Sequence, residues 1–162
     1  MRTGIRLATH ADLDAVATTR AQAWAETYPG LIPDAVIAAQ QQRMPLVVMH
    51  LQGLLDQGHS IWLGLVDGRI VGHAHAFVAD EPDAAEPLEL ASLYLLRSAQ
   101  GIGLGRRLMF TAIGDAPCQV WVLESNQKAI DFYAAAGFEP DGASKEVAPA
   151  FAGALEIRMV RS

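Results

Sequence analysis

Three glycines on alternate residues form the part of the sequence whose spacing most directly predicts chemistry. Gly101, Gly103 and Gly105 follow the apolar stretch 93–96 and lead into a segment with apolar residues at helical spacing. A glycine has no Cβ, so its backbone amide can approach a bulky anion, and the first amides of a helix have no partner inside the helix. The helix dipole adds partial positive charge at the same point. The turn therefore suits a pyrophosphate.

Two common nucleotide-binding motifs do not fit this turn. A Walker-type loop needs Gly-x-x-x-x-Gly-Lys-Ser/Thr, and the chain contains no such string. The dinucleotide motif Gly-x-Gly-x-x-Gly fails because its third glycine would fall on Arg106 or Leu108, depending on where the motif starts. A glycine-rich turn that binds no ligand is the remaining alternative.

The elements that must position this turn can be predicted from hydrophobic patterns and turn signals. Asp67-Gly68 is a type I′ hairpin signal between two strands, because glycine tolerates the positive φ of that turn. Helices are predicted at 13–24, at a short segment starting at residue 33, and at 46–55, 103–112 and 126–136. Strands are predicted at 5–8, 61–66, 69–78, 88–96, 119–123 and 155–160, with one more strand just before the last. The order indicates one α/β (α+β) domain over residues 1–162, with a mixed, mostly antiparallel sheet of about seven strands flanked by helices.

A second stretch agrees with the glycine-rich turn in pointing to one family. Gln100-x-x-Gly103-x-Gly105 after a Leu-Tyr-Leu strand resembles the acyl-CoA-binding motif of the GNAT superfamily of N-acyltransferases. About twenty residues on, segment 124–138 is similar to the family's later motif, in which Asn126 opens a helix, Tyr133 closes it, and Gly-Phe follows. Segments 5–13 and 68–72 fit as well, so the resemblance covers nearly the whole chain in order. Two motifs about twenty residues apart, in this strand and helix context, are strong evidence for the resemblance.

The resemblance implies a site for acetyl-CoA as co-substrate. The pantetheine arm would pair with the backbone of one strand where the sheet splits between its fourth and fifth strands, and the pyrophosphate would rest on the amides of the glycine-rich turn. The residues to which the resemblance gives these binding roles are Leu93, Leu95, Gln100, Gly101, Ile102, Gly103, Leu104, Gly105, Arg106, Asn126, Ala129, Phe132 and Tyr133. Ile102 is apolar where many relatives carry a basic residue, so we expect Arg106, Arg107 or Lys128 to supply the charge.

Acyl transfer to an amine makes two demands on the residues near the thioester. A lysine-like amine of pKa ~10.4 must lose its proton, which costs roughly 4 kcal/mol at pH 7, and the departing thiolate needs a proton. Tyr133 is the candidate acid, because the family places its tyrosine here; a core tyrosine is the alternative. Glu89 is the candidate base or water relay, since alternation along its strand places it on the same face as Leu93 and Leu95. A solvated carboxylate at the strand end fits equally well.

A few other side chains could contact the acceptor or bind a ligand. Trp24 and Tyr28 lie where similar proteins cover the acceptor, and His73 shares a strand face with His75, so Trp24, Tyr28 and His73 are candidate acceptor contacts. Trp24 also continues the apolar stripe of the first predicted helix, which favours core packing. No further ligands at suitable spacing accompany the histidines, so we predict no metal site. Cys118 has no recognisable base partner and is expected to be a buried hydrophobe.

Composition limits the classes of partner. Twelve basic and eighteen acidic side chains give a net charge of −6, which disfavours duplex DNA because that affinity needs a basic face. No apolar run approaches the ~20 residues that cross a bilayer, no secretory signal opens the chain, and one cysteine fits a reducing cytosol. We expect a cytoplasmic protein without nucleic-acid or membrane partners. Homodimers are common among similar proteins, and the sequence leaves that state open.

The expected function is an N-acetyltransferase that moves an acetyl or other short acyl group from acetyl-CoA to a primary amine of a small molecule or peptide. Direct attack in a ternary complex is the expected mechanism, because no nucleophile for an acyl-enzyme is evident. A catalytically idle acyl-CoA sensor or interaction module on the same fold is the alternative. A toxin that acylates charged tRNA would need a basic patch that the composition does not indicate, and binding of acetyl-CoA but not ATP or NAD would exclude a nucleotide-binding protein.

Overall fold

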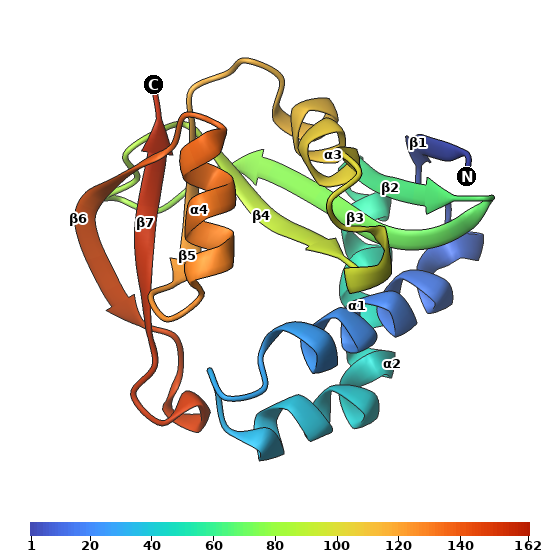
Figure 1. Cartoon of the computed structure of the whole chain (residues 1–162), viewed down its shortest axis with the longest axis horizontal. Coiled ribbons are helices and arrows are strands. Elements are labelled where there is room, and N and C mark those ends of the chain that lie inside the picture. Colours follow the sequence, from blue (N-terminus) through green and yellow to red (C-terminus); the bar gives the residue numbers. More distant parts are fainter.

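A computed structural model describes all residues 1–162 as four helices packed on one seven-stranded sheet (Figure 1). The helices are α1 (Leu13–Thr27), α2 (Asp34–Asp56), α3 (Leu104–Ile113) and α4 (Gln127–Ala135). The strands are β1 (Thr3–Leu7), β2 (Ile61–Val66), β3 (Arg69–Val78), β4 (Leu88–Leu95), β5 (Cys118–Leu123), β6 (Glu139–Glu146) and β7 (Leu155–Arg161). Short 3-10 helices cover His10–Asp12, Arg97–Ala99 and Pro149–Phe151. None of the helices combines the length and the apolar character needed to cross a membrane.

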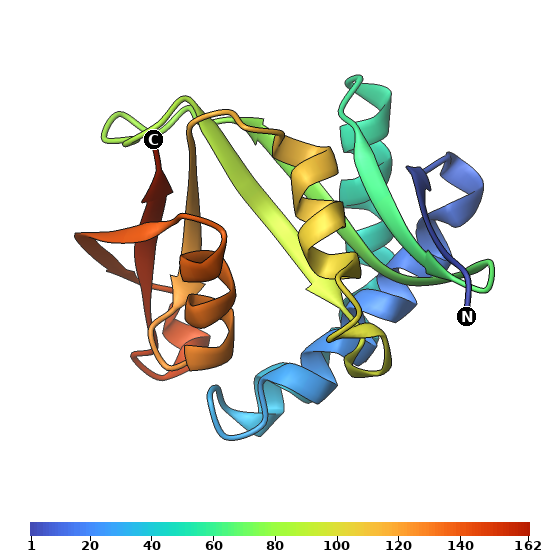
Figure 2. The ribbon, with the colours of Figure 1, turned by 45° about the horizontal axis from the view of Figure 1, so that its top comes forward.

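The strands pair in the order β1-β2-β3-β4-β5-β7-β6, and only the contact between β4 and β5 is parallel. This contact consists of a single residue pair, Glu89 with Gln119. Beyond that pair the two strands diverge, which Figures 1 and 2 both show. The mixed, mostly antiparallel sheet of seven strands is therefore confirmed.

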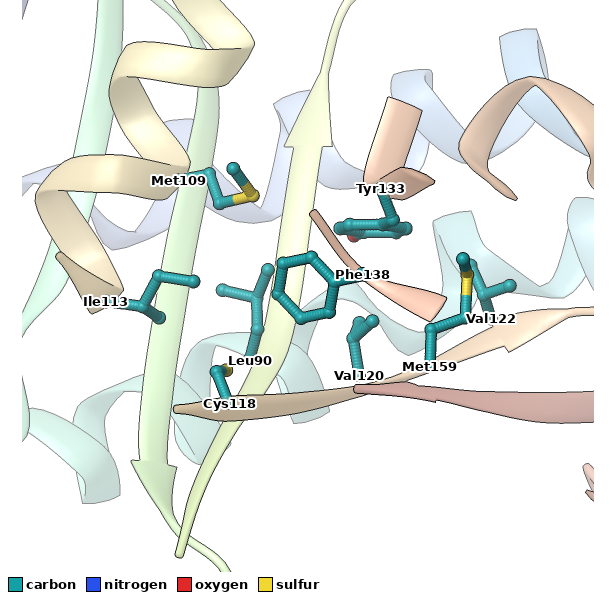
Figure 3. Close-up of a cluster of buried hydrophobic side chains, with 9 residues drawn as sticks. All are labelled: Leu90, Met109, Ile113, Cys118, Val120, Val122, Tyr133, Phe138 and Met159. Atoms are coloured by element: carbon teal, nitrogen blue, oxygen red, sulfur yellow. The ribbon is translucent and has the colours of Figure 1, made fainter. Parts of the chain in front are cut away.

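The helices form a layer on each face of the sheet. Helices α1 and α2 pack together on one face, where Leu13, Val16 and Leu51 form a core cluster with Ile61 and Leu63 of β2. Helices α3 and α4 lie on the other face (Figures 1 and 2). There the largest core cluster gathers side chains from α3, α4, β4, β5 and β7 around Phe138, and Figure 3 shows them pointing toward one another. This cluster connects the two parts of the sheet on either side of the diverging strands.

Local sequence signals predicted several of the element boundaries. Asp67 and Gly68 both have positive φ, 48° and 79°, as the predicted type I′ hairpin between β2 and β3 requires. Gly103 is the residue that caps α3, with a left-handed φ of 79°, so the helix begins one residue later than predicted. The strand expected before the last one is β6, which carries few apolar residues and is mostly exposed.

One prediction about the helices is wrong. The expected short helix at residue 33 and the separate helix at 46–55 are a single helix, α2, which runs through Pro45. Proline lacks the N–H for one helical hydrogen bond and crowds the preceding turn, which favours a break. Here both halves are held by neighbours: Gln40, before the proline, accepts a hydrogen bond from Arg20 of α1 at 2.8 Å, and Leu51, after it, is buried in the core. Tertiary packing overrides the local preference.

A β-bulge in β4 corrects the predicted orientation of Glu89. Pairing with β3 places Leu90 opposite Ala76 and Ser92 opposite His75, so Ala91 is an extra residue in β4. Side-chain alternation restarts after such a bulge. Glu89 therefore shares the α1–α2 face with Tyr94, and it does not share a face with Leu93 and Leu95 as simple alternation predicted.

Candidate active site

The glycine-rich turn before α3 presents a row of free backbone donors. Gly101 and Gly103 have φ of 78° and 79°, a left-handed conformation that glycine adopts without strain. None of the six consecutive amides from Gly101 through Arg106 donates a hydrogen bond to a backbone or side-chain acceptor of the protein. Successive free amides at a helix start form a nest that binds anions.

Gln100 links this turn to its surroundings on two sides. Its Nε2 donates to the carbonyl oxygen of Leu95 at 3.0 Å, and its Oε1 accepts from Lys128 Nζ of α4 at 2.5 Å. Of the expected cations, Lys128 thus lies beside the turn, while Arg107 donates to Thr3 Oγ1 at 2.9 Å, toward β1. Arg106 is exposed and has no side-chain hydrogen bond or ion pair. Its side chain lines an open pocket with Ile5 of β1 and Trp62 of β2.

Gly105 and Asn126, to which the resemblance gives binding roles, lie beside the divergence of β4 and β5. Gly105 packs between β4 and α4, because a Cβ built on it would lie 3.5 Å from Leu95 Cδ2 and 3.6 Å from Phe132 Cε2. Asn126 caps α4, its Oδ1 accepting from the amide of Ala129 at 3.2 Å. The capping bond fixes the start of α4 beside the divergence of β4 and β5.

The three tyrosines of the chain come together from three different elements. Tyr133 of α4 is buried in the cluster of Figure 3, with its ring edge-on to Phe138 at a centroid distance of 5.6 Å. Burial raises the pKa of Tyr133 far above its usual value, and the nearby phenol of Tyr94 adds to the rise. Burial likewise raises the pKa of Tyr28, with further rises from Tyr94 and Tyr133. The phenols of Tyr28 and Tyr133 therefore keep their protons at neutral pH.

Tyr94 is a candidate site residue that the sequence analysis did not single out. It belongs to the Leu-Tyr-Leu strand that precedes the glycine-rich turn, and that position was a usable signal. Its ring centroid lies 5.4 Å from that of His73, so it faces the α1–α2 side of the sheet. Its phenol is near enough to raise the pKa both of Tyr28, at the end of α1, and of Tyr133, which belongs to the opposite layer.

Glu89 lies where β4 and β5 make their only pairing. Its side chain is 9% exposed, and its Oε1 accepts a hydrogen bond from Gln119 Nε2 at 2.8 Å. Gln119 is fully buried and is oriented by a second bond, since its Oε1 accepts from the amide of Ala85 at 2.7 Å. Burial raises the pKa of Glu89, and the bond from Gln119 lowers it by less. Glu89 is on the α1–α2 face, whereas Tyr133 belongs to the other layer.

The predicted acceptor contacts Trp24 and Tyr28 are in direct contact with each other. Their rings meet edge to face with centroids 4.9 Å apart, and Phe151 of the β6–β7 connection lies 6.3 Å from Trp24. An open groove of about 580 Å³ runs beside Phe151, between the α1–α2 loop and the β6–β7 connection. Its lining residues are Gly30, Leu31, Ile32, Pro33, Asp34, Glu124, Ser125, Phe151, Ala152, Gly153, Ala154 and Leu155. Neither Tyr133 nor Glu89 lines it.

The buried histidines and the cysteine are neutral at physiological pH. His73 and His75 share a strand face, as predicted, and burial lowers the pKa of each to about 4. The charge of Arg20 contributes to the shift at His73, and His75 hydrogen-bonds His59 at 3.0 Å. No group of three or more His, Cys, Asp or Glu side chains is placed to hold a metal ion. Cys118 is fully buried, which raises its pKa to about 11, as expected for a small core residue.

One comparison with known proteins identifies a family. Residues 20–138 match the family model described as the acetyltransferase (GNAT) family. A search of curated proteins finds no match.

Solved structures share the fold along the whole chain. The PaiA N-acetyltransferase from Thermoplasma acidophilum in complex with coenzyme A has a TM-score of 0.76 at 18% identity, with 100% of this chain and 99% of that chain covered. A ribosomal-protein-alanine N-acetyltransferase from Brucella melitensis has a TM-score of 0.72 at 24% identity and 98% coverage of both chains. A protein described as histone acetyltransferase HPA2 and related acetyltransferase from Corynebacterium glutamicum has a TM-score of 0.72 at 20% identity, with 99% and 96% covered. At these identities the similarity shows a common fold.

Proposed function

The chain belongs to the GNAT family of acetyltransferases, and we propose that it transfers an acetyl or other short acyl group from acyl-CoA to a primary amine by direct attack in a ternary complex. The observation that carries this proposal is the row of six free amides from Gly101 through Arg106. A pyrophosphate would satisfy several of these donors at once, with Arg106 and Lys128 nearby. The CoA present in the Thermoplasma structure supports the same choice of ligand.

The gap between β4 and β5 suits the rest of the acyl-CoA molecule. A pantetheine arm running from the nest would pass Leu95, Gly105 and Phe132, and it would pair with the free edge of β4 at Leu93 and Leu95 in the manner of an added strand. Such pairing uses backbone groups that β5 leaves without a partner beyond the Glu89–Gln119 contact. The thioester would then reach the region of Tyr133.

Glu89 and Tyr133 would divide the two proton transfers between them. Glu89, on the α1–α2 face, would take the proton of the incoming ammonium group, directly or through a water molecule, and its raised pKa makes it a better base than an exposed carboxylate. Tyr133, whose raised pKa keeps it protonated, would donate to the departing thiolate from the α4 side. The amine would enter from the α1–α2 side, past Tyr28 and Tyr94.

Release of free CoA from acetyl-CoA, measured as a new thiol against a panel of primary amines, tests this function. Thermal unfolding with acetyl-CoA, ATP or NAD provides a separate measurement of binding. Amine-dependent thiol release supports the proposal. Stabilisation by acetyl-CoA without release for any amine would instead indicate an acyl-CoA sensor on the same fold. If acetyl-CoA produced no stabilisation, the assignment of the nest to a pyrophosphate would be wrong.

A further inference from the structure

Arg20 of α1 is a cation that the protein itself does not neutralise. Its guanidinium lies 4.7 Å from the centroid of the Trp24 ring and 5.8 Å from that of Tyr94. Its Nη1 donates to Gln40 Oε1 at 2.8 Å, and Gln40 is buried and anchored by a bond from its own Nε2 to the carbonyl oxygen of Val36 at 3.1 Å. The two rings and the amide hold the guanidinium in a defined place.

This guanidinium has more donors than the protein uses. An arginine side chain carries five N–H donors, and the bond to Gln40 is the only hydrogen bond that the side chain of Arg20 makes. No carboxylate forms an ion pair with it, whereas Lys145 has both Glu81 and Glu156 within 3.7 Å. The charge of Lys145 thus has carboxylate partners within the protein, and the charge of Arg20 has none.

Two neighbours of Arg20 also lack partners. The protein has three buried side-chain nitrogen or oxygen atoms without a hydrogen bond, and two of them are Trp24 Nε1 and His73 Nδ1. His73 is 2% exposed, and the charge of Arg20 lies close enough to shift its titration. Leaving buried polar groups unpaired is unfavourable. The indole N–H of Trp24 and the spare N–H groups of Arg20 are therefore donors without acceptors in the protein.

We propose that Arg20 binds a carboxylate of the acceptor, so that the substrate is an amine that carries a carboxylate, as an amino acid does. The proposal rests on the function proposed above, because Arg20 lies on the α1–α2 side of β4 from which the amine would enter. A protein with a net charge of −6 repels an anionic substrate at long range. A fixed guanidinium supplies the local attraction and orients the carboxylate through paired N–H donors.

The test compares standard L-amino acids with their α-amides as acceptors in the thiol-release assay. The amine of an amino-acid amide loses its proton more easily than that of the acid, so intrinsic reactivity favours the amide. We expect the native protein to prefer the acid by about 10- to 100-fold in kcat/KM, the contribution of a hydrogen-bonded charge pair. In Arg20→Gln the acid-to-amide ratio should fall toward one. Arg20→Lys should retain part of the preference, and Arg43→Gln, which changes an exposed arginine on α2, should retain all of it.

Equal use of acid and amide by the native protein, or a preference that survives Arg20→Gln, would overturn the inference. Melting temperatures of the three variants show whether each one is folded, and Arg20→Lys provides the comparison if Arg20→Gln is not. If no amine released CoA, the proposed function itself would be wrong. The role of Arg20 would then be decided by calorimetric titration of the same amino acids into the protein with CoA present. Equal binding by native protein and Arg20→Gln would exclude it.

Discussion

Substitutions at Arg106 can separate the backbone amide from the side-chain charge at the glycine-rich turn. Arg106 is the third residue of α3, its side chain is exposed, and its N–H has no acceptor in the protein. Arg106→Ala removes the charge and keeps the amide, whereas Arg106→Pro removes both. Proline is tolerated in the first helical turn, and the preceding residue, Gly105, has no Cβ for the proline ring to crowd.

The expected affinities follow from the two kinds of contact. An exposed arginine near a phosphate contributes up to about 1 kcal/mol, so Arg106→Ala should weaken CoA binding by less than about fivefold. A hydrogen bond from an amide to a charged phosphate contributes about 1.5–3 kcal/mol, so Arg106→Pro should weaken binding a further 10- to 100-fold. Isothermal titration with CoA measures both values, and thermal unfolding checks that the two variants are equally stable. Equal CoA affinity of the two variants would show that this amide does not contact the ligand.

Four other substitutions give independent tests. Tyr133→Phe should lower kcat about 100-fold while the Kd for acetyl-CoA changes little by calorimetry, and an unaltered kcat would remove Tyr133 from the mechanism. Glu89→Gln should flatten the acid limb of the kcat/KM pH profile, which in the native protein rises as a carboxyl group with a raised pKa loses its proton. Lowering the pH should also reduce the unfolding free energy, because the pKa of His73 is about 4 when folded against 6.5 when unfolded. The unfolding free energy loses nothing to His73 above pH 6.5, and it falls by about 3 kcal/mol as the pH is lowered to 4. Urea unfolding of His73→Phe should therefore show an unfolding free energy that depends less steeply on pH. The same pH dependence in the native protein and the variant would contradict this. Gly72→Ala should cost about 2–4 kcal/mol, since the new Cβ would lie 2.3 Å from the carbonyl oxygen of Tyr94, and an unchanged melting temperature would refute the clash.

Local signals explain what the sequence could predict. The hairpin at Asp67-Gly68 and the start of α3 at Gly103 depend on backbone conformations that glycine adopts without strain, so they can be recognised without knowledge of the rest of the fold. The succession of strands and helices along the chain was also predictable, because each element has its own hydrophobic pattern or motif. These features are set by residues close together in the chain.

Features set by distant residues were not predictable in the same way. The bulge at Ala91 depends on pairing with β3, and a small residue in an apolar strand gives no sign of it. The continuity of α2 through Pro45 depends on Gln40 and Leu51 meeting partners elsewhere. The same holds for Arg20, which belongs to no motif and acquires its setting only when α1, α2 and β4 come together.

The single pair that joins β4 to β5 has a consequence for self-association. A strand edge with unpaired backbone groups can recruit strands of other molecules and so cause aggregation, and proteins usually shield such edges at the perimeter of a sheet. Most of β4 is an edge of this kind, yet it lies in the middle of the sheet order, with β5 and β7 beyond it. Because β4 is in the middle of the sheet order, its unpaired backbone groups are not at an outer strand, where a strand of another folded copy could pair with them. The molecule can thus retain an unpaired edge permanently without the risk that an outer strand would bring.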